Sequence, residues 1–238
     1  DKTDFQRFRA KKVKQIEMTS KPRIVLAIEA AIHGGSIAML EESREAASWN
    51  GSADKSRAED LLSNIENLFE KANISKQNVS SIAVSNGPGS YTGIRIGIAT
   101  ALGLKNALEI ECIGVSLLSS IAYAHSELKK NIVAVPIGRA EICWQPFNAM
   151  RSVAEARSGT VENFLEAARG LSEFSILLHR ELYNSLRSDP RFGVLQSRMI
   201  DGGQNLAVAV GIAAQIPDMV SDLQPFYIQT SRFTPVNV

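Results

Sequence analysis

The stretch Asn86-Gly87-Pro88-Gly89-Ser90-Tyr91-Thr92-Gly93 carries more structural information than any other part of this 238-residue chain. It follows an apolar, strand-like run at 81–85 and opens a helix-like run at 94–108. Three glycines and a proline within eight residues predict a loop whose backbone another molecule can approach closely. Because the loop leads into a helix, its free N–H groups also form a candidate anion site.

Two familiar phosphate-binding motifs do not fit this loop. A Walker loop needs a lysine after its second glycine, and the loop contains no lysine. The dinucleotide fingerprint G-x-G-x-x-G would need a third glycine where Thr92 stands. The loop therefore either binds an anion in another way or shapes a contact with a protein.

The order of apolar runs predicts an α/β fold with two lobes. The long connections between the strands of the first half require parallel neighbours with helical crossovers. Ser56 and Glu59 form a capping box that begins the first helix, and Asn73 is its expected end. Strands are expected at 23–29, 36–40, 44–49, 81–85, 111–115, 132–137, 141–147 and 175–178, and helices at 56–72, 94–108, 116–128, 160–169 and 206–216.

Composition indicates a soluble globular protein, with 45% hydrophobic and 21% charged residues and no apolar run long enough to cross a bilayer. Cys112 and Cys143 both lie in apolar runs, which favours buried free thiols and a reducing compartment, although a disulfide stays open. Basic charge is concentrated at the start of the chain. Residues 1–23 hold eight Lys and Arg against three acidic residues, and the rest holds 18 against 22.

The longer string from Asn86 to Gly97 resembles the signature of the TsaB/YeaZ family of Gcp-like proteins, and a weaker resemblance runs from about residue 23 to 227. It implies a two-lobed acetate kinase/Hsp70/actin-like (RNase H-like) fold whose second lobe is abbreviated. The expected parts are a basic N-terminal extension at 1–22, an N-terminal lobe at 23–130 and a smaller C-terminal lobe at 131–238. The extension could contact tRNA phosphates or be a solvated arm.

The resemblance also implies a role. Such proteins are non-catalytic subunits that dock to and activate a TsaD-like enzyme in tRNA N6-threonylcarbamoyladenosine modification. A TsaE-like ATPase joins the complex, and the isolated subunit forms a homodimer. No cofactor is required, although ATP or ADP can lie at the subunit boundary. Contact with tRNA is expected to be indirect or weak, and the location cytoplasmic.

A stripe of small residues recurs every four positions on the helix after the loop, namely Gly93, Gly97 and Ala101. Such a small-residue stripe lets the backbone of another helix come close. A glycine inside a helix costs about 0.5–1 kcal/mol relative to alanine, so Gly97 needs a compensating contact, either internal or with another chain. The resemblance favours the second alternative, with the first two helices docking to TsaD. The interface residues expected are Leu61, Leu62, Ile65, Phe69, Gly93, Gly97, Ala101 and Leu104.

The loop residues expected at the site are Gly87, Pro88, Gly89, Ser90, Tyr91, Thr92, Gly93 and Arg95. Arg95 could reach an anion, or it could pair with a carboxylate such as Glu59 or Asp60, or face solvent. Ser90 and Thr92 could contact phosphate, but capping of the helix is their commoner role. Tyr91 is either a contact residue or a cover for the loop.

Catalysis and a metal site are not expected. His33, His125 and His179 are the only histidines, and none lies within four residues of another. Where the family has an Asp-Thr pair this chain has Glu29 and Ala30, Arg57 replaces a histidine, and the segment 136–138 replaces an Asp-Ala-Arg stretch. The alternative is a small nucleotide-binding phosphotransferase or ATPase of the same fold. Residues 201–205 could form a second ligand loop or a turn that begins the last helix.

Overall fold

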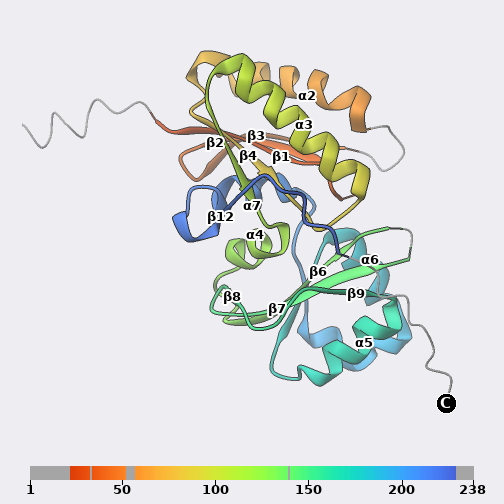
Figure 1. Cartoon of the computed structure of the whole chain (residues 1–238). Coiled ribbons are helices and arrows are strands. Elements are labelled where there is room, and N and C mark those ends of the chain that lie inside the picture. The colour runs from red at the N-terminus through yellow and green to blue at the C-terminus, as the bar shows by residue number, and fades with distance from the viewer. Residues whose placement is uncertain (1–21, 33, 52–56, 139, 229–238) are drawn as a thin grey trace, which may run out of the picture.

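The structure, a computed structural model, describes residues 22–32, 34–51, 57–138 and 140–228. These residues form two lobes, each built on a six-stranded sheet (Figure 1). Residues 1–21 of the expected basic extension, His33 and the expected capping residue Ser56 lie outside the described residues. In the described part of the chain, no helix is long and apolar enough to cross a membrane.

The first sheet has the strand order β12-β5-β4-β1-β2-β3. Its first three strands form an antiparallel meander, and β4 and β5 then add in parallel beside β1. All six residues of β1 are buried, as expected for a strand that helices cover on both faces. The strands are β1 (Ile24–Glu29), β2 (Ser36–Glu41), β3 (Arg44–Asn50), β4 (Ser81–Ser85), β5 (Glu111–Val115) and β12 (Val220–Ser221).

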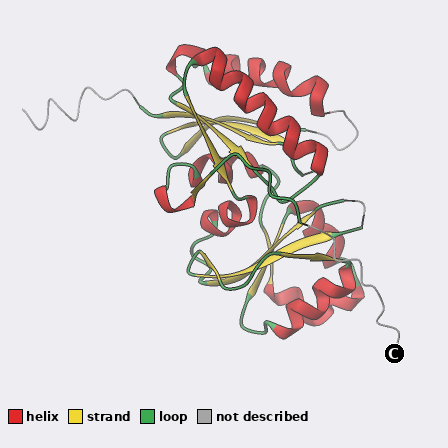
Figure 2. Cartoon of the chain, viewed as in Figure 1, coloured by secondary structure: helices red, strands yellow, loops and turns green. Residues whose placement is uncertain are grey.

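Two helices cover the outer face of this sheet, α2 (Arg57–Ala72) and α3 (Tyr91–Leu108) (Figure 2). Helix α2 ends where predicted, because Asn73 adopts the left-handed conformation with φ 53°. Helix α3 begins three residues earlier than predicted. The Oγ of Ser90 accepts a hydrogen bond from the backbone N–H of Gly93 at 3.4 Å, so Ser90 caps the helix as the commoner interpretation expected.

The second sheet has the order β11-β10-β6-β7-β8, with β9 also paired to β7. Strands β6, β10 and β11 are parallel, and β7 runs antiparallel to β6. Helices α5 and α6 and the 3₁₀ segment η2 supply an apolar cluster on one side of it. The elements are β6 (Lys130–Pro136), β7 (Ile142–Asn148), β8 (Arg151–Ser152), β9 (Arg157–Gly159), β10 (Ser175–Leu178), β11 (Met199–Asp201), α5 (Val161–Gly170), α6 (Arg180–Arg187) and η2 (Pro190–Arg198).

Helices α4 (Leu117–Ala124) and α7 (Leu206–Ala213) pack on each other between the two sheets (Figure 1). A single cluster of buried residues therefore includes Val25 from the first sheet, Val210 from α7 and Phe147 from the second sheet. Helix α7 packs on β1 and β2, and β12 pairs with β5. The second lobe is thus shorter than the predicted range 131–238, because the chain returns to the first lobe after β11.

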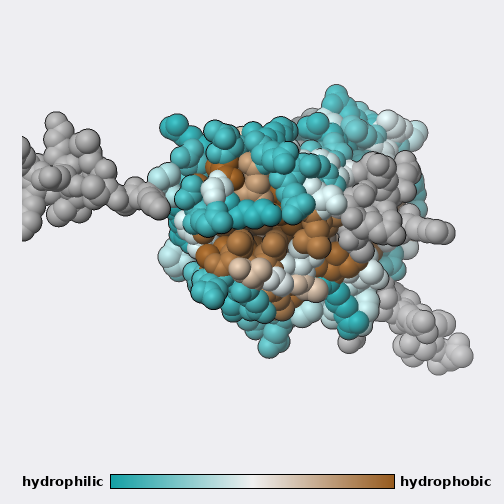
Figure 3. All heavy atoms as spheres, turned by 90° about the horizontal axis from the view of Figure 1, so that it is seen from above, coloured by the Kyte–Doolittle hydropathy of each residue, from teal (hydrophilic) through white to brown (hydrophobic). Residues whose placement is uncertain are grey.

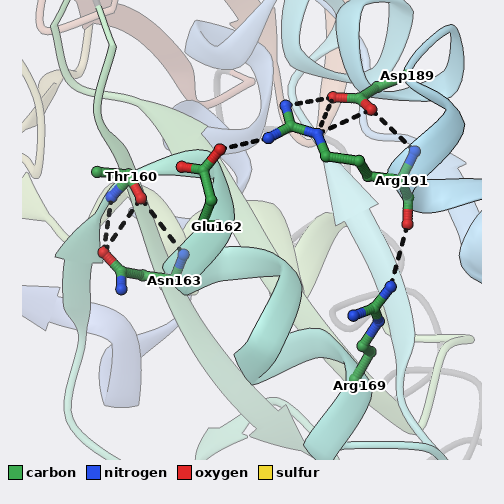
Figure 4. A network of polar contacts seen from close by, with 6 residues as sticks. All are labelled: Thr160, Glu162, Asn163, Arg169, Asp189 and Arg191. Carbon is green, nitrogen blue, oxygen red and sulfur yellow. Dashed lines mark hydrogen bonds and ion pairs between the residues drawn. The ribbon is translucent and has the colours of Figure 1, made fainter.

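A polar network in the second lobe joins the start of α5 to η2 (Figure 4). The guanidinium of Arg191 bonds to the carboxylates of Asp189 and Glu162, and Thr160 and Asn163 form a capping box at the start of α5. The hydrogen bond from Arg191 holds the pKa of Asp189 below its ordinary value. All of these contacts join one part of the chain to another, so the network stabilises the lobe.

The two cysteines are free, as predicted. Cys143 is buried and Cys112 is half-buried. Burial raises the pKa of Cys112 to about 11, so its thiol stays protonated near neutral pH.

Candidate functional site

The glycines of the signature loop, residues 86–93, leave space that other segments of the same chain occupy. A Cβ added to Gly89 would lie 2.7 Å from the carbonyl oxygen of Ala31, in the turn after β1. A Cβ added to Gly87 would lie 2.6 Å from the carbonyl oxygen of Phe226. Gly87 also has φ 113°, which favours glycine. Close approach of backbone to this loop was predicted, but the approaching segments belong to the chain itself.

Hydrogen bonds hold the loop between β1 and α4. The N–H of Ser90 donates to the carbonyl of Ala31 at 2.8 Å, and the N–H of Leu117 donates to the carbonyl of Gly87 at 2.8 Å. Pro88 is buried, whereas Thr92 is exposed in the first turn of α3. The loop is therefore a packed connection that fixes where α3 begins.

Residues 222–228, which we call the C-terminal strap, cross the loop after β12 (Figure 1, dark blue). The N–H of Phe226 donates to the carbonyl of Asn86 at 2.7 Å. The side-chain amide of Asn86 donates to the Oγ of Ser221 at 2.9 Å. Gly114 on β5 also accommodates the strap, because a Cβ there would lie 2.1 Å from the carbonyl oxygen of Asp222.

The strap places Tyr227 beside the first turn of α3. The rings of Tyr91 and Tyr227 lie 4.7 Å apart between centroids, and the guanidinium of Arg95 lies 3.8 Å from the centroid of Tyr91. The Nε of Arg95 donates to the hydroxyl of Tyr227 at 3.0 Å, which raises the pKa of Arg95. We call these three residues the Tyr–Arg–Tyr cluster. Sequence reasoning singled out Tyr91 and Arg95 but missed Tyr227, because no local pattern links residues so far apart.

Most of the predicted interface residues face the chain's own core. Leu62 is exposed and Leu104 is half-buried, whereas the other six are buried, namely Leu61, Ile65, Phe69, Gly93, Gly97 and Ala101. A Cβ on Gly97 would lie 3.3 Å from the Cβ of Ala30 and 3.7 Å from Cγ2 of Val84. The internal explanation of the small-residue stripe is therefore the one that the structure supports, and the inner face of α3 is not open to a second chain.

The opposite face of α3 is exposed, and it carries apolar residues beside the polar Thr92, Lys105 and Asn106. It presents Ala99, Leu102, Gly103 and Ala107, and Leu102 is 37% exposed. On α2, which packs on α3, Leu62 is 55% exposed. Figure 3 looks down on these helices and shows hydrophobic residues in the middle of this side, with a row of hydrophilic residues crossing them. We call Leu62, Ala99, Leu102, Gly103 and Ala107 the outer face.

Glu29 and Asp201 hold turns of the backbone. The buried Oε1 of Glu29 accepts hydrogen bonds from the N–H groups of Ala31 at 2.5 Å and Ile32 at 3.0 Å. The Oδ1 of Asp201 accepts from the N–H of Gly203 at 2.9 Å, and Asn205 caps α7. The interpretation of 201–205 as a turn that begins the last helix is confirmed.

Histidine and acidic side chains do not gather at one place in the described residues. No group of three or more His, Cys, Asp or Glu there could hold a metal ion. His179 is buried in front of α6, and His125 lies 3.5 Å from a carboxylate oxygen of Glu127. The outer face and the Tyr–Arg–Tyr cluster are both exposed in the described structure.

Comparisons with known proteins point to one family. The model described as TsaD, tRNA N6-adenosine threonylcarbamoyltransferase, matches residues 51–177, more than half of the chain. The chain is 31% identical over 124 residues to the tRNA threonylcarbamoyladenosine biosynthesis protein TsaB of Buchnera aphidicola subsp. Schizaphis graminum, covering 51% of this chain and 59% of that protein. It is 33% identical over 98 residues to TsaB of Bacillus subtilis, covering 41% and 43%. The chain thus spans about half the length of the curated relatives it matches.

A solved structure, YeaZ from Pseudomonas aeruginosa, aligns with a TM-score of 0.62 at 18% identity. The alignment covers 87% of this chain and all of that one. Likeness at this identity shows the fold, and it confirms the two-lobed α/β architecture that was expected from the sequence.

Proposed function

Because the chain belongs to the TsaB/YeaZ branch of the family described by the TsaD model, we propose that it is an accessory subunit in tRNA N6-threonylcarbamoyladenosine modification. In this role it docks to a TsaD-like catalytic subunit and holds that subunit in its active state. The contribution is architectural, since the chemistry belongs to the partner.

The outer face is the observation that carries this proposal. Isolated exposed apolar side chains do not mark a binding surface, whereas those that gather in one patch mark a surface that another protein covers. Leu62 and Leu102 are of this kind, and both lie within the segment that the family model matches. Ala99, Gly103 and Ala107 recur every four residues along α3, so a partner helix can approach its backbone closely.

The proposal includes the remaining parts of such a complex. A TsaE-like ATPase joins it, and ATP or ADP lies at the boundary between the subunits. In the absence of the partner the outer face supports a homodimer. The chain's own contact with tRNA is indirect or weak, because its residues after 23 hold 18 basic against 22 acidic side chains. We place the complex in the cytoplasm.

The test is a binding measurement with the purified TsaD-like subunit of the same organism, followed by an assay of modified adenosine in tRNA. We expect Leu102→Glu to weaken binding by about tenfold or more, as truncation of an interface anchor does. Val194→Glu is the matched control, because Val194 is 77% exposed on η2 in the other lobe. Equal binding by both variants, or no binding by the unaltered chain, would contradict the proposal.

The alternative of a phosphotransferase or ATPase receives less support. It would use the Glu29 carboxylate for a metal or phosphate site, but that carboxylate is buried and accepts two backbone hydrogen bonds. Turnover of ATP with magnesium by the isolated chain would favour the alternative over docking.

A further inference from the structure

We propose that the Tyr–Arg–Tyr cluster is a second anchor of the docking surface, which recognises a carboxylate on the partner protein. The inference rests on the proposed function and adds to it a defined contact and a role for the C-terminal strap. Tyr91 and Arg95 come from α3 and Tyr227 comes from the strap, so two distant segments build the anchor together.

The three side chains of the cluster contact one another although they are exposed. Tyr91 is 53% exposed and Tyr227 is 38% exposed, yet their rings contact each other and Arg95 stacks on Tyr91. Stacking and the bond to Tyr227 fix the guanidinium before any partner arrives. A side chain that is already fixed loses less conformational entropy on binding, which favours affinity. Tyr and Arg are also the residue types that dominate binding energy at protein interfaces.

The position of the cluster continues the outer face. Residues 91, 95 and 102 are separated by four and seven positions, which places them on one side of a helix. Tyr91 and Arg95 therefore lie at the N-terminal end of the same exposed stripe that carries Leu102 farther along α3. A partner that covers the outer face would meet the cluster at its edge.

The chemistry of Arg95 defines what it recognises. Its Nε donates a hydrogen bond to the hydroxyl of Tyr227, and the guanidinium also interacts with Tyr91, so the two tyrosines orient it. A guanidinium presents paired donors that match the two oxygens of a carboxylate. The mildly acidic charge of the chain after residue 23 disfavours RNA as the occupant of the cluster. An Asp or Glu of the TsaD-like subunit, set among apolar residues, fits both the donors and the rings.

The experiment measures binding of the full chain to the purified TsaD-like subunit for Arg95→Gln, Arg95→Lys and Tyr227→Ala. We expect Arg95→Gln and Tyr227→Ala each to weaken binding about tenfold, the range of interface anchors. Arg95→Lys keeps the charge but lacks the planar pair of donors, so it should recover only a small part of the affinity. The double variant should lose less than the product of the two single losses, because the residues act as a unit.

Arg187→Gln is the matched control. The guanidinium of Arg187 lies 5.4 Å from the ring of Tyr183 on α6, so the control removes a similar Arg–Tyr contact from the other lobe. It should bind the partner like the unaltered chain. Melting temperatures of all the variants should stay close together, because the substituted side chains are exposed or lie at the surface.

Three different results would contradict the inference. If the unaltered chain binds the TsaD-like subunit and Arg95→Gln and Tyr227→Ala bind equally well, the cluster is not an anchor, whatever these variants do to self-association or tRNA binding. If the unaltered chain does not bind, the proposed function falls as well. Full recovery by Arg95→Lys would contradict paired recognition of a carboxylate.

Discussion

Gly97 and Gly103 lie on the same helix but have opposite surroundings. A Cβ on Gly97 would meet Ala30 and Val84, whereas a Cβ on Gly103 would have nothing within 4 Å. Both glycines lie inside the helix, where alanine would have the higher helix propensity. The sequence pattern cannot distinguish them, because periodicity groups residues on a face without saying what covers that face.

Substitutions at these two glycines should have opposite effects on stability. We expect Gly97→Leu to lower the free energy of unfolding by about 1–3 kcal/mol, because the added side chain overpacks the contact between α3 and the first sheet. Gly103→Ala should raise it by about 0.5–1 kcal/mol through helix propensity alone. Urea unfolding of both variants checks the prediction, and a similar change in both would contradict it.

At the scale of elements, local signals predicted the first lobe well. The strands at 81–85 and 111–115 have the predicted bounds, and α2 ends at Ala72, directly before the predicted stop residue Asn73. The predicted helix at 116–128 ends earlier, at Ala124. Helix α6 and the segment η2 were not predicted, since both are short and rich in polar residues. Amphipathic patterns are hard to recognise over so few turns.

The strap could not be predicted for a different reason. Its contacts join residues more than 100 positions apart, such as Gly114 and Asp222 or Arg95 and Tyr227. No helix or strand period connects such residues, and the strap itself is irregular after the two-residue strand β12. Gly87 and Gly114, which lie against the strap, stand out in the sequence. A glycine indicates only that some group approaches the backbone closely, and it does not say which segment that is.

The strap should be displaced by a single methyl group on β5. In Gly114→Ala, the new Cβ would overlap the carbonyl of Asp222, so we expect β12 and the strap to leave the sheet. The measurement is hydrogen exchange, in which the N–H of Phe226 should lose protection. Gly138→Ala is the control, because a Cβ there meets nothing within 4 Å. Retained protection at Phe226 in Gly114→Ala would contradict the prediction.

At the scale of the whole molecule, the two lobes share one core. The cluster between the sheets contains residues of both, and α4 and α7 fill the space between them. Two-lobed architecture was predicted from the repeated order of elements, but the shared core was not. The reason is that α7 follows the second lobe in sequence and packs on the first.

A shared core predicts that the lobes unfold together. Each lobe carries one of the two tryptophans, Trp49 in β3 and Trp144 in β7. Trp49→Phe and Trp144→Phe each leave a reporter for one lobe, and their fluorescence midpoints in urea should coincide. Adding Phe147→Ala, which removes a fully buried ring, should lower the free energy of unfolding by about 3–5 kcal/mol in both reporters. Separate midpoints would show two independent lobes.

The return of α7 and β12 to the first sheet has a consequence for synthesis on the ribosome. When residues 22–130 have emerged, one side of the meander still lacks α7, and β5 still lacks its edge neighbour. The lobe that translation begins first is therefore finished last. The nascent protein must carry an apolar sheet surface until α7 and β12 have been made, so we expect chaperones that shield growing chains to bind it during that interval.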